Sequence, residues 1–88
     1  MTLEQLNTTL CEIFGQQNVK PHDKGFRVIV DYEDMPYCVI VKVDDNGSNI
    51  KLNKDAIDEK EENYDEAYRK AYRLLVQHGG KIDVQVDI

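Results

Sequence analysis

Two stretches in the middle of the chain alternate between apolar and polar residues, and they limit the fold more than any other feature. The first is FRVIVDY, residues 26–32, and the second is YCVIVKV, residues 37–43. Side chains with a period of two lie on alternate faces of a β-strand, so each stretch predicts a strand with one apolar face. The intervening residues EDMP (33–36) are typical of a turn. The sequence therefore predicts a pair of adjacent strands at the centre of the fold.

Two further strands are expected on the C-terminal side of this pair. Asn46-Gly47 is a strong hairpin signal, and the short stretch NIKLN (49–53) follows it. The tail KIDVQVDI (81–88) alternates throughout and is predicted to be the last strand. The tail residues expected to face the core are Ile82, Val84, Val86 and Ile88.

Helical spacing of apolar residues is found over residues 2–14. Thr2 and Gln5 have the spacing of a capping box, and Gly15 is a natural stop for a helix. The residues expected on the apolar face are Leu3, Leu6, Leu10, Ile13 and Phe14. Residues 16–25 are mostly polar and contain Pro21, so we interpret them as a connection without regular structure.

A second helix is predicted from about Asn63 to His78. Its expected apolar stripe consists of Tyr64, Ala67, Tyr68, Ala71, Leu74, Leu75 and His78. A backward extension over residues 54–63 could bury only Ala56 and Ile57, so we expect a polar loop or a short separate turn there. The element order is then α-β-β-β-α-β. The predicted fold class is α+β, an antiparallel sheet of three to four strands with two helices packed on one face, in a single domain spanning residues 1–88.

Size and composition narrow the function classes. A chain of 88 residues with 41% hydrophobic residues can build one small core. No apolar run approaches the roughly 18 residues that cross a bilayer, and the first ten residues lack the pattern of a signal peptide. We therefore expect a cytoplasmic protein with no membrane partner. Cys11 and Cys38 are too few for a disulfide framework and are expected to be reduced.

Reactive and metal-binding motifs are not evident. Counted from Asp44, the loop DDNGSN has its glycine at the fourth position, whereas an EF-hand needs it at the sixth. The candidate zinc ligands, which have no close ligand spacing, are Cys11, His22, Cys38 and His78. Neither cysteine lies at a predicted helix N-terminus, and no glycine-rich phosphate loop is present. We expect neither an enzyme nor a cofactor or metal site.

The order α-β-β-β-α over residues 3–78, with FRVIV as a first strand, resembles that of double-stranded-RNA-binding domains. The resemblance implies a last helix that begins with lysines, which contact phosphates across a groove. In this chain the matching positions are Glu61, Glu62, Asp65 and Glu66. Together with a net charge of −6, this argues against direct nucleic-acid binding. A domain of this type used for dimerisation or scaffolding is the alternative function.

The stretch DAIDEKEENYDE, residues 55–66, contains seven acids and one lysine and is called the acidic segment below. It can be a solvated boundary in front of a helix, or an anionic surface for a basic partner. The candidate partner-binding acids are Asp55, Asp58, Glu59, Glu61, Glu62 and Asp65.

Three apolar candidates complete the predicted partner-binding set. Tyr72 is expected on the flank of the second helix, and Ile29 and Ile40 on the sheet face away from the core. That face, or an open strand edge, is also a route to a homodimer. In size, charge and architecture the chain is similar to compact acidic α+β proteins of phages and mobile elements, including those that block CRISPR systems. The sequence therefore favours a non-catalytic inhibitor that docks on a basic, nucleic-acid-handling protein surface.

Overall fold

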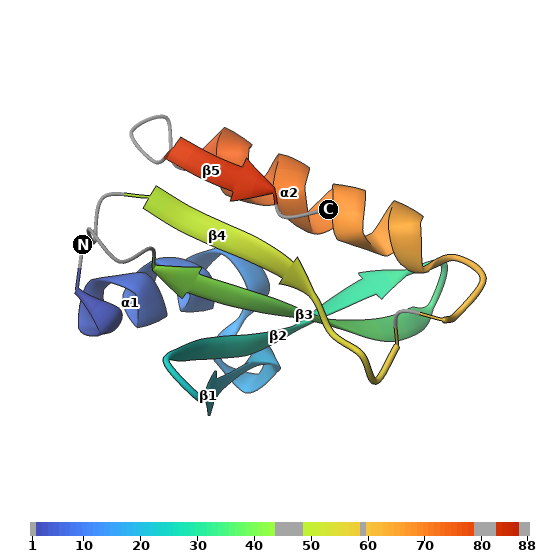
Figure 1. Ribbon diagram of the computed structural model, residues 1–88, viewed down its shortest axis with the longest axis horizontal. Coiled ribbons are helices and arrows are strands. Elements are labelled where there is room, and N and C mark those ends of the chain that lie inside the picture. Colours follow the sequence, from blue (N-terminus) through green and yellow to red (C-terminus); the bar gives the residue numbers. More distant parts are fainter. Residues whose placement is uncertain (1, 44–48, 59, 79–82, 87–88) are drawn as a thin grey trace.

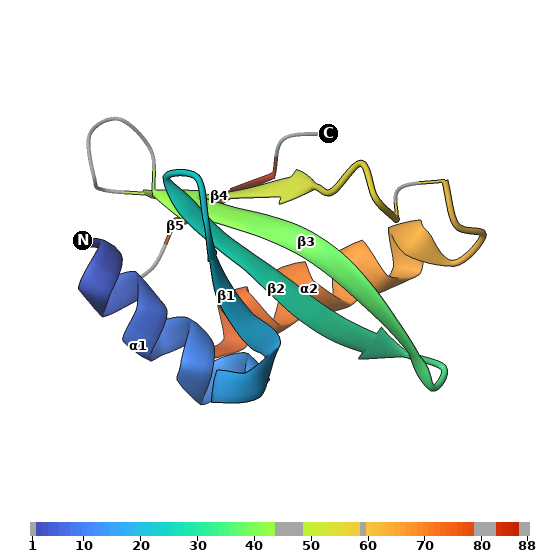
Figure 2. The same cartoon turned by 90° about the horizontal axis from the view of Figure 1, so that it is seen from below.

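The computed structural model describes residues 2–43, 49–58, 60–78 and 83–86. The elements, in chain order, are α1 (Leu3–Phe14), a short 3₁₀ helix η1 (Gln16–Asn18), β1 (Val19–His22), β2 (Gly25–Tyr32), β3 (Met35–Val43), β4 (Asn49–Lys54), α2 (Tyr64–His78) and β5 (Asp83–Val86). Both helices lie on the same side of the twisted sheet, as Figures 1 and 2 show from two directions. The other side is called the open face below.

The sheet confirms the α+β class and adds two features to it. Its strands lie in the order β1-β2-β3-β4-β5, and the first four are antiparallel neighbours. β5 is parallel to β4. Parallel neighbours need a crossover connection, and α2 supplies it by carrying the chain across the sheet between β4 and β5. The sheet therefore has one strand more than the sequence suggested, and its last pair is parallel.

The additional strand is β1, which lies where we expected an irregular connection. Hydrophobic alternation did not reveal it because its two central residues, Lys20 and Pro21, are exposed. Pro21 lies opposite Phe26 of β2. A proline has no N–H to donate and is tolerated in edge strands, which is the place of β1 in the sheet. Pairing of backbone groups rather than burial of side chains therefore forms this strand.

One hydrophobic core joins the helices to the sheet. Its buried members are Leu6, Leu10, Phe26, Val28, Val30, Tyr37, Val39, Val41, Ile50, Leu52, Tyr64, Ala67, Tyr68, Ala71 and Leu75. Most of the predicted apolar faces are thus confirmed, whereas Leu3 is half exposed and His78 lies on the surface. Leu3 is in the first turn of α1, and His78 is the last residue of α2, so the two exceptions lie at helix ends.

The local signals at the ends of α1 are confirmed. The Thr2 hydroxyl accepts the Gln5 N–H at 3.1 Å, and the Gln5 side chain accepts the Thr2 N–H at 2.8 Å, which completes the capping box. Gly15 ends the helix with a φ of 94°, a conformation that favours glycine. The predicted hairpin turn at Asn46-Gly47 and the tail residues Ile82 and Ile88 lie outside the described residues. None of the helices in the described part of the chain is long and apolar enough to span a membrane.

Candidate functional site

The acidic segment leaves the end of β4 as a series of turns and not as an extension of α2. Backbone N–H groups of Asp58, Glu61 and Tyr64 each donate to the carbonyl three residues earlier, at 3.0–3.1 Å. α2 then begins at Tyr64. The expected polar loop before the helix is confirmed, and it brings the acidic residues alongside the sheet.

Asp55 is part of an internal ion pair. Its carboxylate accepts hydrogen bonds from Arg27 Nε at 2.7 Å and from the Ile57 N–H at 3.1 Å. Only 5% of the residue is exposed. Arg27 is on β2 and Asp55 follows β4, so the arginine side chain crosses the intervening strand β3 on the open face. The expectation that Asp55 is displayed for a partner is wrong, because the arginine neutralises it and the sheet buries it.

Ile40 lies beneath this ion pair. It is the cross-strand partner of both Arg27 on β2 and Asn53 on β4, and only 7% of it is exposed. Its expected role in an exposed apolar patch on the open face is therefore wrong. Ile29 and Cys38, also on the open face, are half-buried. The side-chain oxygen of Asn53 is buried beside Ile40 and has no hydrogen-bond partner in the described structure.

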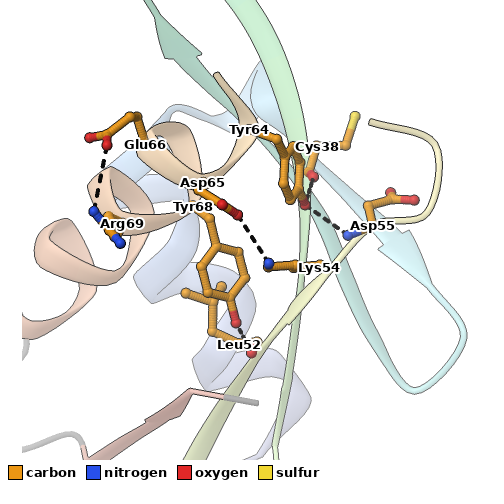
Figure 3. Close-up of polar contacts among 9 residues, drawn as sticks. All are labelled: Cys38, Leu52, Lys54, Asp55, Tyr64, Asp65, Glu66, Tyr68 and Arg69. Carbon is orange, nitrogen blue, oxygen red and sulfur yellow. Dashed lines mark hydrogen bonds and ion pairs between the residues drawn. The ribbon is translucent and has the colours of Figure 1, made fainter. Parts of the chain in front are cut away.

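Asp58 and Tyr64 close the edge of β3 beyond the end of β4 (Figure 3 shows the tyrosine contacts). The Cys38 N–H donates to Asp58 Oδ2 at 2.9 Å, and the Tyr64 hydroxyl donates to the Cys38 carbonyl at 2.6 Å. The same hydroxyl accepts the Asp55 N–H at 2.8 Å. Asp58 is therefore a half-buried structural acceptor, and this use competes with its expected role at a partner surface.

The contacts at this edge also raise the pKa of its two titratable groups. Burial, together with the hydrogen bond and negative charge of Asp58, raises the pKa of the Cys38 thiol from 9.0 to about 11. Burial, with the charges of Asp55 and Asp58, raises the pKa of Tyr64 from 10.0 to about 12. Both shifts favour the protonated group over its anion, so the folded edge is more stable with the thiol and the phenol neutral.

The remaining acids of the segment stay on the surface. Glu61 and Glu62 are exposed, and Asp65 is exposed but lies 3.0 Å from Lys54 Nζ. The side chain of Glu59 lies outside the described residues. Figures 1 and 2 place the acidic segment and the turn between β2 and β3 at the same end of the molecule.

That turn contributes acids that the sequence analysis did not select. The exposed acids at this end, called the acidic end below, are Asp31, Glu33, Asp34, Glu61, Glu62 and Asp65. The signal that could have identified the first three is the run DYED between two alternating strands. The sequence did not reveal the structural roles of Arg27 and Tyr64, because their partners are distant in the chain. Arg27 is 28 residues from Asp55, and Tyr64 is 9 residues from Asp55 and 26 from Cys38.

The three apolar candidates do not form one surface. Tyr72 is 37% exposed on the flank of α2, in the helix layer. Ile29 and Ile40 belong to the open face, on the other side of the sheet. Of the described residues, no group of three or more His, Cys, Asp or Glu side chains is arranged to hold a metal ion.

Comparison of the chain with protein-family models, with curated proteins and with solved structures finds no match. Because β1 adds a fourth strand between α1 and α2, the element order also departs from the α-β-β-β-α expected for double-stranded-RNA-binding domains.

Proposed function

We propose that this protein is a non-catalytic binding protein that docks its acidic end on a basic surface of another protein. The single observation that carries the proposal is the placement of six exposed acids at one end of a small scaffold, from two segments distant in the chain. Clustered charge of one sign accelerates encounter with an oppositely charged partner and selects against wrong ones.

The internal contacts of the acidic segment support a rigid display. The carboxylate of Asp55 pairs with Arg27, and that of Asp58 accepts a hydrogen bond from the β3 backbone. These contacts anchor the turns that carry Glu61 and Glu62. A preorganised surface loses less conformational entropy on binding than a flexible acidic tail does. The segment therefore combines two functions, with anchoring acids at its start and displayed acids further on.

The proposed partner is a protein that normally handles nucleic acid, and the proposed effect is antagonism. A basic surface of that kind is built to hold closely spaced phosphates, and an acidic protein can compete for it. We place this activity in the cytoplasm, in keeping with the free thiols of Cys11 and Cys38. Phage or mobile-element antagonists of bacterial defence, such as inhibitors of CRISPR systems, are the proposed class.

The alternative, a double-stranded-RNA-binding-like scaffold, is supported by the antiparallel strands β2, β3 and β4 between two helices on one face. The start of α2 argues for the first proposal. The cations Lys54 and Arg69 pair there with Asp65 and Glu66, at 3.0 and 3.5 Å, and are not arranged as a free basic row.

The test is affinity capture from a bacterial lysate with the wild type and two matched variants. Glu61→Gln/Glu62→Gln removes two charges at the acidic end. Glu4→Gln/Asp23→Asn removes two exposed charges from the first turn of α1 and from the turn between β1 and β2, and Figure 1 shows both segments at the other end of the molecule. We expect the wild type to capture a basic protein, and we expect added duplex DNA or RNA to displace that protein. We also expect the first variant to weaken capture about three- to tenfold and the second to leave it unchanged.

Two results would contradict the proposal. Equal capture by both variants at moderate salt would mean that the acidic end is only solvated. Capture that added nucleic acid does not reduce would exclude a nucleic-acid-handling surface as the docking site.

A further inference from the structure

Among the described residues, no strand pairs with the edge of β2 from Ile29 to Tyr32 on the side of β1. β2 pairs with β3 along its whole length, whereas β1 pairs only with Gly25–Val28. β1 begins opposite Val28, in the middle of β2, and Figure 2 shows β2 continuing from there to the hairpin turn with β3. A strand edge without a neighbour offers backbone groups to a further strand.

The direction of these backbone groups follows from the turn. Glu33 and Asp34 form a two-residue turn, so Tyr32 and Met35 beside it exchange hydrogen bonds. Pairs alternate along the ladder, so Ile29 and Asp31 direct their N–H and C=O groups away from β3. Two observations agree with this: the Asp31 carbonyl accepts Lys70 Nζ from α2, and its partner Pro36 has no N–H to offer.

A small cavity of about 150 Å³ adjoins the same edge, between β2 and the two helices. Its lining is mixed, with Ile13, Phe14, Val30 and Leu74 on the apolar side and Asn18, Asp31 and Lys70 on the polar side. A cavity of this size can hold one medium-sized side chain. A strand added beside β2 would direct alternate side chains to the helix side, where this cavity could receive one of them.

Charge around the edge determines what kind of strand fits. Asp31, Glu33 and Asp34 are exposed at the end of the edge near the turn. Lys70 is a neighbouring cation, and its ammonium group donates a hydrogen bond to the Asp31 carbonyl. A second copy of this chain would bring its own Asp31, Glu33 and Asp34 and a net charge of −6 to this edge, which repulsion disfavours.

We propose that the β2 edge binds an extended basic segment of a partner protein by strand addition. Backbone hydrogen bonds to Ile29 and to the Asp31 N–H hold the segment, one side chain enters the cavity with its apolar part against Phe14 and Leu74, and lysine or arginine side chains meet the three acids. This inference rests on the proposed function and names the part of the basic partner that is bound. It is separable from that function, because the edge and residues 61–62 can be altered independently.

The test uses an acetylated peptide in which lysine and leucine alternate over seven residues. Titration of the ¹⁵N-labelled protein at low salt should shift the amide signals of Ile29, Asp31 and the cavity residues. Asp31→Pro removes the outward N–H, which β3 does not use, and Asp31→Asn removes only the charge. We expect Asp31→Pro to weaken peptide binding about tenfold and Asp31→Asn less than threefold.

A second measurement leaves the protein unchanged and covers the case in which Asp31→Pro does not fold. Two versions of the peptide carry methyl groups on alternate sets of backbone nitrogens. We expect one of them to lose binding about tenfold, because it removes the N–H groups that face β2.

Equal binding of all three peptides would overturn the inference, as would no binding of the unmodified peptide. Binding that is insensitive to Asp31→Pro but weakened by Glu61→Gln/Glu62→Gln would overturn the inference and leave the proposed function standing. Sedimentation that shows a dimer in the wild type and a monomer in Asp31→Pro would overturn it in favour of a second copy at the edge.

Discussion

β2 and β3 form one hairpin, in which β2 extends past β1 and β3 extends past β4. The two edges that extend in this way differ in the side chains that bond them. On β3, Asp58 accepts the Cys38 N–H and Tyr64 donates to the Cys38 carbonyl. On β2, the side chain of Lys70 reaches the Asp31 carbonyl from α2. The edge of β3 is closed by the buried Tyr64 and the half-buried Asp58, whereas the Asp31 contact on β2 is exposed.

The difference arises from the path of the chain. After β4 the acidic segment passes over the edge of β3 before α2 begins, so side chains are at hand to bond the backbone there. Before β1 the chain forms η1, which lies against β2, and the side chain that bonds the backbone of β2 beyond β1 is that of Lys70 from α2. A protein commonly protects an exposed strand edge, so an edge left open beside a cavity points to use by a partner.

The largest expected effect belongs to the closed edge. Tyr64→Phe removes a buried hydroxyl that bonds the Cys38 carbonyl and the Asp55 N–H, and leaves both backbone groups without that partner. We expect the free energy of unfolding to fall by about 2–3 kcal/mol in urea denaturation. Tyr72→Phe, on the exposed flank of the same helix, is the control and should change it by less than about 0.5 kcal/mol. Similar losses in the two variants would mean that the β3 edge needs no closure.

The ion pair over β3 gives the next effect. Asp55→Asn leaves Arg27 without its charged partner on a half-covered surface, and we expect a loss of about 2 kcal/mol. A double-mutant cycle with Arg27→Met separates the pair from the other contacts of Asp55. We expect a coupling energy of about 1–2 kcal/mol. Additive effects would show that the two side chains stabilise the segment independently.

Alkaline pH tests the closed edge without a structural change. The pKa of Cys38 rises on folding from 9.0 to about 11, and that of Tyr64 from 10.0 to about 12. Above pH 9 the unfolded chain releases protons that the folded protein keeps, so stability is complete below pH 9 and falls as pH rises towards 12. One such group lowers the free energy of unfolding by up to about 1.4 kcal/mol per pH unit.

The matching measurement is the free energy of unfolding between pH 8 and pH 12 for the wild type and for Tyr64→Phe. We expect a shallower decline in the variant between pH 10 and 12, because it has no phenol at this position to titrate. The Tyr72→Phe control should decline as steeply as the wild type. Equal slopes in all three proteins would show that the Tyr64 environment does not favour the protonated phenol.

The smallest effect is expected at the open edge. Lys70→Met removes the one side chain that bonds the Asp31 carbonyl in the described structure. Because this contact is exposed, we expect thermal or urea unfolding to show a loss below about 0.5 kcal/mol. A loss above about 1 kcal/mol would mean that Lys70 closes the β2 edge much as Tyr64 closes that of β3, and the contrast between the edges would disappear.

Much of the fold was predictable because its signals are local. The period of two in residues 26–32 and 37–43, the period of the helices and the capping box at Thr2 each depend on neighbours within a few residues. β1 escaped notice because an edge strand with Pro21 and exposed side chains carries no hydrophobic pattern. The parallel pairing of β5 also could not be read from its alternation, because both directions of pairing alternate faces.

The candidate site was predictable only in part. That residues 55–66 are rich in carboxylates is a property of the composition, and Glu61 and Glu62 are exposed as expected. Which acids are used internally depends on the strands over which the segment passes. Asp55 meets Arg27 from a strand 28 residues earlier, and no pattern within the segment marks it.

The sequence by itself determined both helices, the strands other than β1, most of the faces that they bury and the excess of negative charge, since these depend on residue type and short-range spacing. The tertiary structure alone decided which carboxylates are neutralised, which strand edge is closed and that two acidic runs share one end of the molecule. The physical reason is that ion pairs and edge contacts depend on distances in space, and the order of strands in the sheet sets those distances for residues far apart in the chain.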